Sequence, residues 1–226
     1  MADCKICGCK GWLALLDDQG LCRYCAKLAA LDIEQRSRIV KEFKIKADTT
    51  LNPASKIQSM DLMASNLEAL SDYERKGVAT PGSSPQRELS KTRAELDALL
   101  LKTLRSELDQ LIVSAKTAES PEAKLKLFEG FRLKLSEYKG RVRQKGAFET
   151  LEGMLRDSIV DIRLNAAIET ARRAEENGAR AEALRLYKKV LAELNTRDPK
   201  DRRVAERRPW IEEQIRSLEP RKRKSG

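Results

Sequence analysis

Residues Cys4 to Cys25 read CKICGCKGWLALLDDQGLCRYC and contain all five cysteines of the 226-residue chain. Cys4 and Cys7 form one C-x2-C pair, and Cys22 and Cys25 form a second. Two such pairs separated by a dozen or more residues are typical of a zinc site, because each pair directs two thiolates toward one point. The chain has no histidine. We therefore predict one Zn²⁺ held by four sulfur ligands, Cys4, Cys7, Cys22 and Cys25.

Cys9 is the cysteine that this assignment leaves over. In an alternative arrangement it replaces Cys7 as a ligand, but the C-x2-C pair followed by Gly8 is the better knuckle, because glycine adopts positive φ readily. One disulfide pair with a free thiol is a second alternative. The odd number of cysteines and the lack of a recognisable secretory signal favour a reducing compartment instead. A redox-active C-x2-C is disfavoured because no βαβ pattern surrounds it.

The residues between the two pairs predict a small β-hairpin. Trp12 to Leu16 is a short apolar run that fits a strand, and Asp17 to Gly20 fits a hairpin turn. After Cys25 the apolar spacing becomes helical. A knuckle, a hairpin and a C-x2-C pair that opens a helix together resemble a treble-clef zinc finger. The resemblance covers about residues 4–31 and implies a fold rather than a function.

The composition predicts long helices and few large core side chains. The formal net charge is +10, charged residues make up 35% of the chain, and aromatic residues make up only 4%. Ala, Leu, Glu, Lys and Arg dominate, as in long-helix proteins. We find no apolar run near the ~18 residues of a membrane span and expect a cytoplasmic protein of one or two domains.

The first predicted helices follow the cysteines. Asp32 to Gln35 fits a capping box, which predicts that a helix starts at Asp32. A second helical stripe occupies residues 55–76. The stretch from Gly77 to Pro85 is rich in proline, glycine and serine and is predicted to be a linker. Ser84 is the expected N-cap of the helix that follows, with Pro85 in its first turn.

Three long apolar stripes then predict three long helices. Ser120-Pro121 is a second helix start, and Asn177-Gly178 is a helix stop. A last helix is predicted from Pro209 to Leu218. The three stripes consist of Leu89, Leu96, Leu100, Leu104, Leu108, Leu111 and Ala115; of Leu125, Phe128, Phe131, Leu135, Tyr138 and Val142; and of Phe148, Leu151, Leu155, Ile159, Ile162 and Ala166.

The predicted fold class is mainly α: a small four-cysteine zinc finger with a β-hairpin, followed by long antiparallel helices that form a bundle or a hairpin array. We predict a zinc finger with its following helix at 1–46 and a short helix with the linker at 47–84. The helical bundle is expected at 85–219 and a basic, disordered tail at 220–226. The long helices, one of them close to a coiled-coil repeat, would also allow oligomer formation.

The C-terminal region resembles two families of helical hairpin. Residues 166–218 are similar to a single tetratricopeptide hairpin and to the three-helix microtubule-interacting-and-transport (MIT) domain. Gly178 stands at the turn, and Ala183 and Tyr187 stand at packing positions. The same cues fit any antiparallel helical hairpin. The resemblance implies binding of a partner protein in a groove between helices. The candidate partner-binding residues are Arg185, Tyr187, Lys188 and Lys189.

The sequence favours a non-enzymatic protein with Zn²⁺ as its only cofactor. No histidine base, phosphate-binding loop or dinucleotide fingerprint is present. The first hypothesis is an adaptor or scaffold that binds a partner protein through its helical region. The alternative is a regulatory protein that binds nucleic acid through the zinc finger and the basic C-terminal clusters. Its candidate contacts are Lys10, Arg23, Arg207, Arg208, Arg221 and Lys222.

Overall fold

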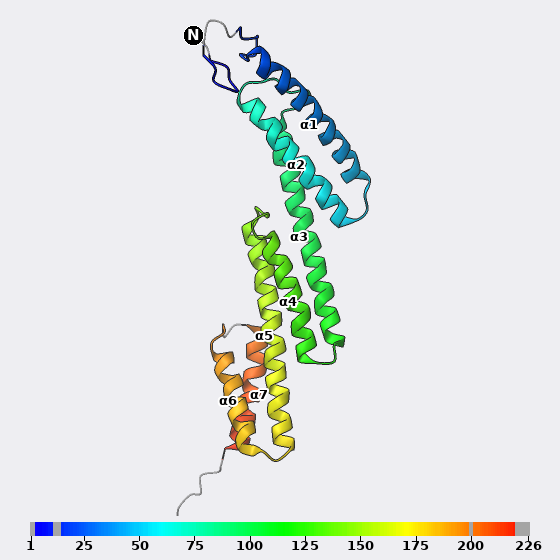
Figure 1. The fold of residues 1–226 in the computed structure, drawn as a ribbon. Coiled ribbons are helices and arrows are strands. Elements are labelled where there is room, and N and C mark those ends of the chain that lie inside the picture. Colours follow the sequence, from blue (N-terminus) through cyan, green and yellow to red (C-terminus); the bar gives the residue numbers. More distant parts are fainter. Residues whose placement is uncertain (1–2, 11–14, 199–200, 220–226) are drawn as a thin grey trace, which may run out of the picture. The chain divides into compact units, whose positions relative to one another are not determined.

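A computed structural model of the chain describes residues 3–10, 15–198 and 201–219 (Figure 1). The described residues form seven α-helices, and the one pairing of extended segments among them is an antiparallel bridge between Leu16 and Cys22. The fold is therefore mainly α, as predicted. The chain divides into two compact units, Met1–Glu107 with Gly140–Phe148, and Leu108–Lys139 with Glu149–Gly226. Among the described residues, no helix is both long enough and apolar enough to cross a membrane.

The first unit is built on a hairpin of α1 (Arg23–Thr49) and α2 (Pro53–Arg75), which pack against each other (Figure 1). The side chain of Asn52 caps α2 by accepting hydrogen bonds from the backbone N–H groups of Ala54, at 2.9 Å, and Ser55, at 3.3 Å. Proline is tolerated at the first position of α2 because that N–H has no partner within a helix. The unit also contains the first part of α3 (Pro85–Thr117).

The prediction that a helix starts at Asp32 is wrong. Asp32 lies inside α1, and its carboxylate accepts hydrogen bonds from Arg36 Nε at 2.8 Å and from Tyr73 Oη at 3.0 Å. The helix runs through this position because buried residues continue at helical spacing on both sides of it, from Cys25 and Ala29 to Val40.

The cysteine-rich segment shares its core with α1 and α2. Cys4 and Leu21 are each 2% exposed, and they belong to the same buried cluster as Leu67 and Leu70 of α2. The segment is therefore packed onto the helical hairpin and does not form a separate domain. The other buried members of the cluster are Cys25, Ala29, Ile33, Val40, Met63, Ala64, Val78 and Leu89.

The segment that was predicted to be a linker, residues 77–85, lies inside the first unit. Its Val78 is buried, and the backbone N–H of Ala79 donates to Gln19 Oε1 at 3.0 Å. Lys5 Nζ donates to the carbonyl oxygen of Gly77 at 3.2 Å. Gly77 has φ +69°, and a Cβ there would lie 3.2 Å from Lys5 Nζ. The glycine thus allows both the turn and the approach of the cysteine-rich segment.

The second unit contains the rest of α3 together with α4 (Pro121–Tyr138), most of α5 (Lys145–Glu176), α6 (Arg180–Asn195) and α7 (Arg202–Leu218). The predicted helix start at Ser120 is confirmed, since its hydroxyl accepts from the N–H of Ala123 at 3.1 Å. The predicted stop at Gly178 is confirmed as well: α5 ends at Glu176, and Gly178 has φ +75°.

The core of the second unit lies among α5, α6 and α7. Ala183 and Tyr187 of α6 are completely buried, as are Leu164 and Ala171 of α5. The ring of Tyr187 meets that of Trp210 edge to face, with 5.9 Å between centroids and 81° between planes. Ala183 and Tyr187, the two packing positions of the hairpin resemblance, therefore contribute to the core of the unit.

The predicted start of the last helix at Pro209 is wrong. α7 begins at Arg202, and Asp201 caps it by accepting from the N–H of Arg203 at 2.9 Å. Pro209 therefore lies inside the helix, where it cannot donate to the carbonyl oxygen of Ala205. Burial of Val204 before the proline and of Ile211 after it holds both parts of the helix on the core.

Candidate metal centre

The structure brings four cysteine sulfurs together. The Sγ atoms of Cys4, Cys7, Cys9 and Cys22 all lie within 4.8 Å of one another, which allows them to hold a metal ion. Cys7 Sγ and Cys22 Sγ are 3.9 Å apart. Two sulfurs that each lie about 2.3 Å from one tetrahedral Zn²⁺ are separated by roughly 3.8 Å, whereas a disulfide requires about 2.05 Å. All five cysteines are free thiols, so this spacing fits shared coordination.

Backbone hydrogen bonds shape the knuckle that carries the first three cysteines. The N–H of Gly8 donates to the carbonyl oxygen of Cys4 at 2.8 Å, and the N–H of Cys4 donates to that of Cys9 at 3.3 Å. Gly8 has φ +65°, as its position after Cys7 predicts. These bonds fold the chain back on itself, which turns the three side chains toward the same side.

The second cysteine pair reaches the knuckle through a tight turn. Asp17 Oδ1 accepts from the N–H groups of Gln19, at 3.0 Å, and Leu21, at 2.8 Å. The predicted turn is thus present, but among the described residues only the Leu16–Cys22 bridge joins the two arms. A β-hairpin is not shown, and the first part of its predicted strand, Trp12 to Ala14, lies outside the described residues.

Backbone N–H groups favour thiolates at two of the sulfurs. The N–H groups of Cys7, Cys22 and Ile6 lower the pKa of Cys4 to about 6. The bond from the Cys22 N–H to Cys4 Sγ measures 3.4 Å. The N–H of Cys25 likewise lowers the pKa of Cys22. Because a thiolate is the form that binds a metal, these contacts prepare both sulfurs as ligands.

Cys9 and Cys25 both have a raised pKa, but for different leading causes. Interaction with the Cys7 side chain, followed by burial, raises the pKa of Cys9 to about 12. Burial, followed by contacts with Cys7, Cys22 and Cys4, raises the pKa of Cys25 to about 12. Cys25 is buried in the first turn of α1. The sulfurs that lie within 4.8 Å of one another therefore include three of the four predicted ligands, Cys4, Cys7 and Cys22, together with Cys9, which the sequence offered only as a replacement for Cys7; Cys25 is not among them.

Three of the six basic residues that were candidates for nucleic-acid contact have polar partners within the protein. Lys10 Nζ lies 3.5 Å from Asp3 Oδ2, and Arg208 Nη2 donates to Asn195 Oδ1 at 2.7 Å. Arg23 is exposed at the start of α1. Arg221 and Lys222 lie outside the described residues. Lys10 and Arg23 belong to the first unit, and Arg207 and Arg208 belong to the second.

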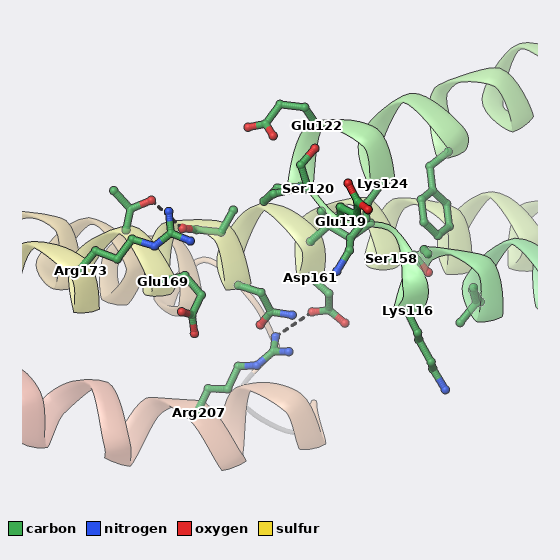
Figure 2. A pocket seen from close by; sticks show the side chains of 18 residues that line it. Lys116, Glu119, Ser120, Glu122, Lys124, Ser158, Asp161, Glu169, Arg173 and Arg207 are labelled. Carbon is green, nitrogen blue, oxygen red and sulfur yellow. Dashed lines mark hydrogen bonds and ion pairs between the residues drawn. The ribbon is translucent and has the colours of Figure 1, made fainter.

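Arg207 belongs to a network of ion pairs in the second unit. Its Nη1 lies 2.9 Å from Asp161 Oδ1, at the edge of a cleft of about 780 Å³ (Figure 2). Asp161 Oδ2 also lies 2.9 Å from Arg203 Nη1, and Asp161 Oδ1 lies 4.0 Å from Arg197 Nη1. Arg203 further contacts Asp201, which raises the pKa of the guanidinium and lowers that of the carboxyl. The sequence missed this network because Asp161, the acid that the three arginines share, lies on α5 and far from them in the chain.

The candidate partner-binding residues have different surroundings. Tyr187 is completely buried and so cannot itself touch a partner. Lys188 Nζ lies 2.9 Å from Glu219 Oε1, and Arg185 Nη2 lies 4.0 Å from Glu182 Oε1, in both cases on the surface. Lys189 is exposed. The surface of α6 is therefore basic but partly neutralised by neighbouring acids.

No family model, curated protein or solved structure matches the chain.

Proposed function

We propose that this protein is a non-enzymatic adaptor in which one structural Zn²⁺ holds the N-terminal segment on the helical hairpin of α1 and α2, and the helical region binds a partner protein. The observation that carries the zinc proposal is the convergence of cysteine sulfurs within 4.8 Å of one another. A site filled by four sulfurs has no open coordination position, so such a metal stabilises structure and performs no chemistry.

The predicted set of four ligands ends with Cys25, whereas the cluster of close sulfurs contains Cys9. Both sets share Cys4, Cys7 and Cys22. We propose Cys25 as the fourth, because it is the buried partner of Cys22 in a C-x2-C pair. Cys9 is then a fifth thiol beside a filled site. Cys4 and Cys25 belong to the core cluster of the first unit and Cys22 packs against it, so metal loss should also loosen α1 against α2.

Metal analysis of single cysteine variants tests this assignment. Full-length protein purified without chelator should contain about one zinc per chain, and Cys9→Ser should keep it. Cys25→Ser and Cys22→Ser should both lose most of the metal and lower the thermal midpoint. Retention by Cys25→Ser together with loss by Cys9→Ser would assign Cys9 as the fourth ligand. A wild-type content below about half an equivalent would contradict the site.

The adaptor proposal and the nucleic-acid alternative differ in salt dependence. Binding through phosphate contacts weakens steeply as salt rises, whereas binding of apolar anchors does not. The internal partners of Lys10, Arg207 and Arg208 support the adaptor. We expect labelled duplex and single-stranded oligonucleotides to bind full-length protein weakly at physiological salt. Tight binding that Arg23→Ala weakens would instead support the alternative.

A further inference from the structure

The sulfur cluster contains one more cysteine than a tetrahedral zinc site uses. Cys9 Sγ lies within 4.8 Å of the sulfurs of Cys4, Cys7 and Cys22. With Cys25 as the fourth ligand, Cys9 has no bond to the metal and lies beside it as a thiol. All five cysteines are free, so no disulfide occupies Cys9. A thiol this close to zinc-bound thiolates can react with one of them when that thiolate is oxidised.

The cysteines differ in how well solvent reaches them. Cys7 is exposed, whereas Cys4 and Cys25 are buried. Cys9 and Cys22 have intermediate exposure. Because thiol–disulfide exchange requires an accessible sulfur, Cys7 is the ligand that a small-molecule disulfide in solution reaches first. Cys7 is also separated from Cys9 by a single residue, Gly8.

The chain between Cys7 and Cys9 is able to close into a disulfide. A disulfide requires Cα atoms about 4.4–6.8 Å apart, and residues two positions apart in a bent chain meet this requirement. Gly8, with φ +65°, bends the chain at this point. Both cysteines lie in the knuckle before α1, so the bond forms without movement of a helix.

We propose, on the basis of the zinc site proposed above, that Cys7 and Cys9 form a redox switch. A small-molecule disulfide of the glutathione type converts the two cysteines to a disulfide, and the zinc site loses its Cys7 ligand. In reducing compartments, protein disulfides of mesophiles are usually transient and redox-sensing, which fits a pair that opens again when glutathione is reduced.

The reaction is a two-step thiol–disulfide exchange. The zinc-bound Cys7 thiolate attacks one sulfur of oxidised glutathione, the glutathione S–S bond breaks, and one glutathione thiolate leaves. Cys7 then carries glutathione in a mixed disulfide and is a poorer ligand, because the thiolate is the form that binds a metal. The Cys9 sulfur attacks Cys7 Sγ, the bond from Cys7 to glutathione breaks, and the second glutathione leaves with the Cys9 proton. The two protein sulfurs lose two electrons, which the oxidised glutathione gains.

The switch changes how the N-terminal segment is held. Loss of the Cys7 ligand leaves the metal with three sulfurs, one fewer than a structural zinc site uses. The segment that the metal holds includes Cys4 and Leu21, which are buried in the same core as α1 and α2. Gln19 of this segment accepts from the N–H of Ala79 at 3.0 Å. Oxidation should therefore loosen the segment and expose the Ala79 amide to exchange.

Zinc release and hydrogen exchange on the zinc-loaded, full-length protein test the switch. Oxidised glutathione should release about one zinc per chain to a chromogenic chelator, and no release should occur without it. Dithiothreitol with added Zn²⁺ should restore the zinc content. The Ala79 amide should exchange faster after oxidation. The Ala54 amide, which Asn52 caps at the start of α2, is the control and should not change.

Peptide mapping identifies the bond. Residues 6–10 form one tryptic peptide that contains both Cys7 and Cys9. The proposed disulfide therefore stays within this peptide, whereas a bond from Cys7 to Cys22 would join two peptides. The map should show the internal disulfide in the oxidised protein and its loss after reduction.

Cys9→Ser separates the switch from zinc binding. The variant should keep about one zinc per chain before oxidation, because Cys9 is not a ligand in the proposed site. In a mixture of reduced and oxidised glutathione it should lose most of the zinc release seen for the wild type. Reduced glutathione reverses the first step when no Cys9 thiol completes the second, and any modified Cys7 should retain glutathione. Cys9→Ala should behave in the same way, which tests whether the serine hydroxyl itself matters.

The other outcomes contradict either the switch or the zinc site. Equal zinc release by Cys9→Ser and wild type, a disulfide from Cys7 to Cys22, or no release from loaded wild type overturns the switch and leaves the zinc site standing. Loss of zinc by Cys9→Ser before oxidation makes Cys9 a ligand and also overturns the switch. Wild-type zinc below about half an equivalent contradicts the zinc site itself. The peptide map then decides alone whether Cys7 and Cys9 pair.

Discussion

The pKa of Tyr187 depends on how its side chain packs in the second unit. Its ring is completely buried, and its hydroxyl oxygen lies 3.3 Å from Glu175 Oε2. Burial, followed by the negative charge of Glu175, raises the pKa of Tyr187 from 10.0 to about 12. Because the folded pKa exceeds the ordinary value, the neutral phenol contributes stability that is fully present below pH 10. That contribution is lost as pH rises through 12.

Replacement of Tyr187 by phenylalanine should therefore change how stability depends on pH. We expect the wild type to lose roughly 1–2 kcal/mol relative to Tyr187→Phe between pH 10 and 12, because only the wild type must bury an ionising phenol. Urea unfolding followed by circular dichroism measures the difference. Tyr24→Phe, at an exposed position, is the control and should run parallel to wild type. Parallel curves for both variants would contradict the prediction.

At the scale of single elements, the contact of α6 with its neighbours depends on the small side chain of Ala183. Ala183 is completely buried in the core of the second unit. Ala183→Leu should overpack this contact and lower the free energy of unfolding by roughly 1–3 kcal/mol. Ala181→Leu, at an exposed position two residues earlier, should have little effect. Equal stability of the two variants in urea denaturation would show that the core can accommodate the added methyl groups.

The contact between α5 and the N-terminal part of α7 depends on Asp161. Its carboxylate faces Arg197, Arg203 and Arg207, and it is 21% exposed. Asp161→Asn would remove the negative charge and one of the two acceptor oxygens that these guanidinium groups share, so we expect a loss of about 1–3 kcal/mol. The surface variant Glu182→Gln should cost less than about 0.5 kcal/mol. Thermal unfolding at low and moderate salt measures both, and an Asp161→Asn effect no larger than that of Glu182→Gln would refute the prediction.

For the whole molecule, the segment Thr80 to Pro85 offers a site for limited proteolysis. The start of α3 packs on the first unit through buried Leu89, and Arg93 Nη2 lies 2.8 Å from Glu68 Oε2 of α2. We therefore expect a chain nicked at this segment to remain one species in size-exclusion chromatography under native conditions. Urea should separate the two fragments. Native separation would show instead that the parts before and after residue 85 are independent modules, as composition alone predicts.

Several features of the fold follow from local sequence. Asn52 with Pro53 and Ser120 with Pro121 start helices, and Gly178 ends one, because each satisfies backbone groups within a few residues of itself. The apolar stripe of α3 is also a local signal. Because a helix has 3.6 residues per turn, the spacing of these residues places them on one side, which is the buried side. The pairing of cysteines within each C-x2-C turn was also predictable, because each such turn is a local structure.

Other features depend on contacts between residues far apart in the chain. Pro209 and Asp32 carry helix-start signals, yet tertiary burial around them keeps both inside helices. Arg207 appears in the sequence as part of a basic cluster, but in the structure it forms an ion pair with Asp161 on another helix. Cys9 joins the sulfur cluster because its Sγ lies within 4.8 Å of that of Cys22, which comes from the far side of the turn. Local spacing thus determined the helices and the cysteine pairs. Only the tertiary structure decided which sulfurs meet, which charges pair and which side of α1 stays exposed, because long-range packing sets all three.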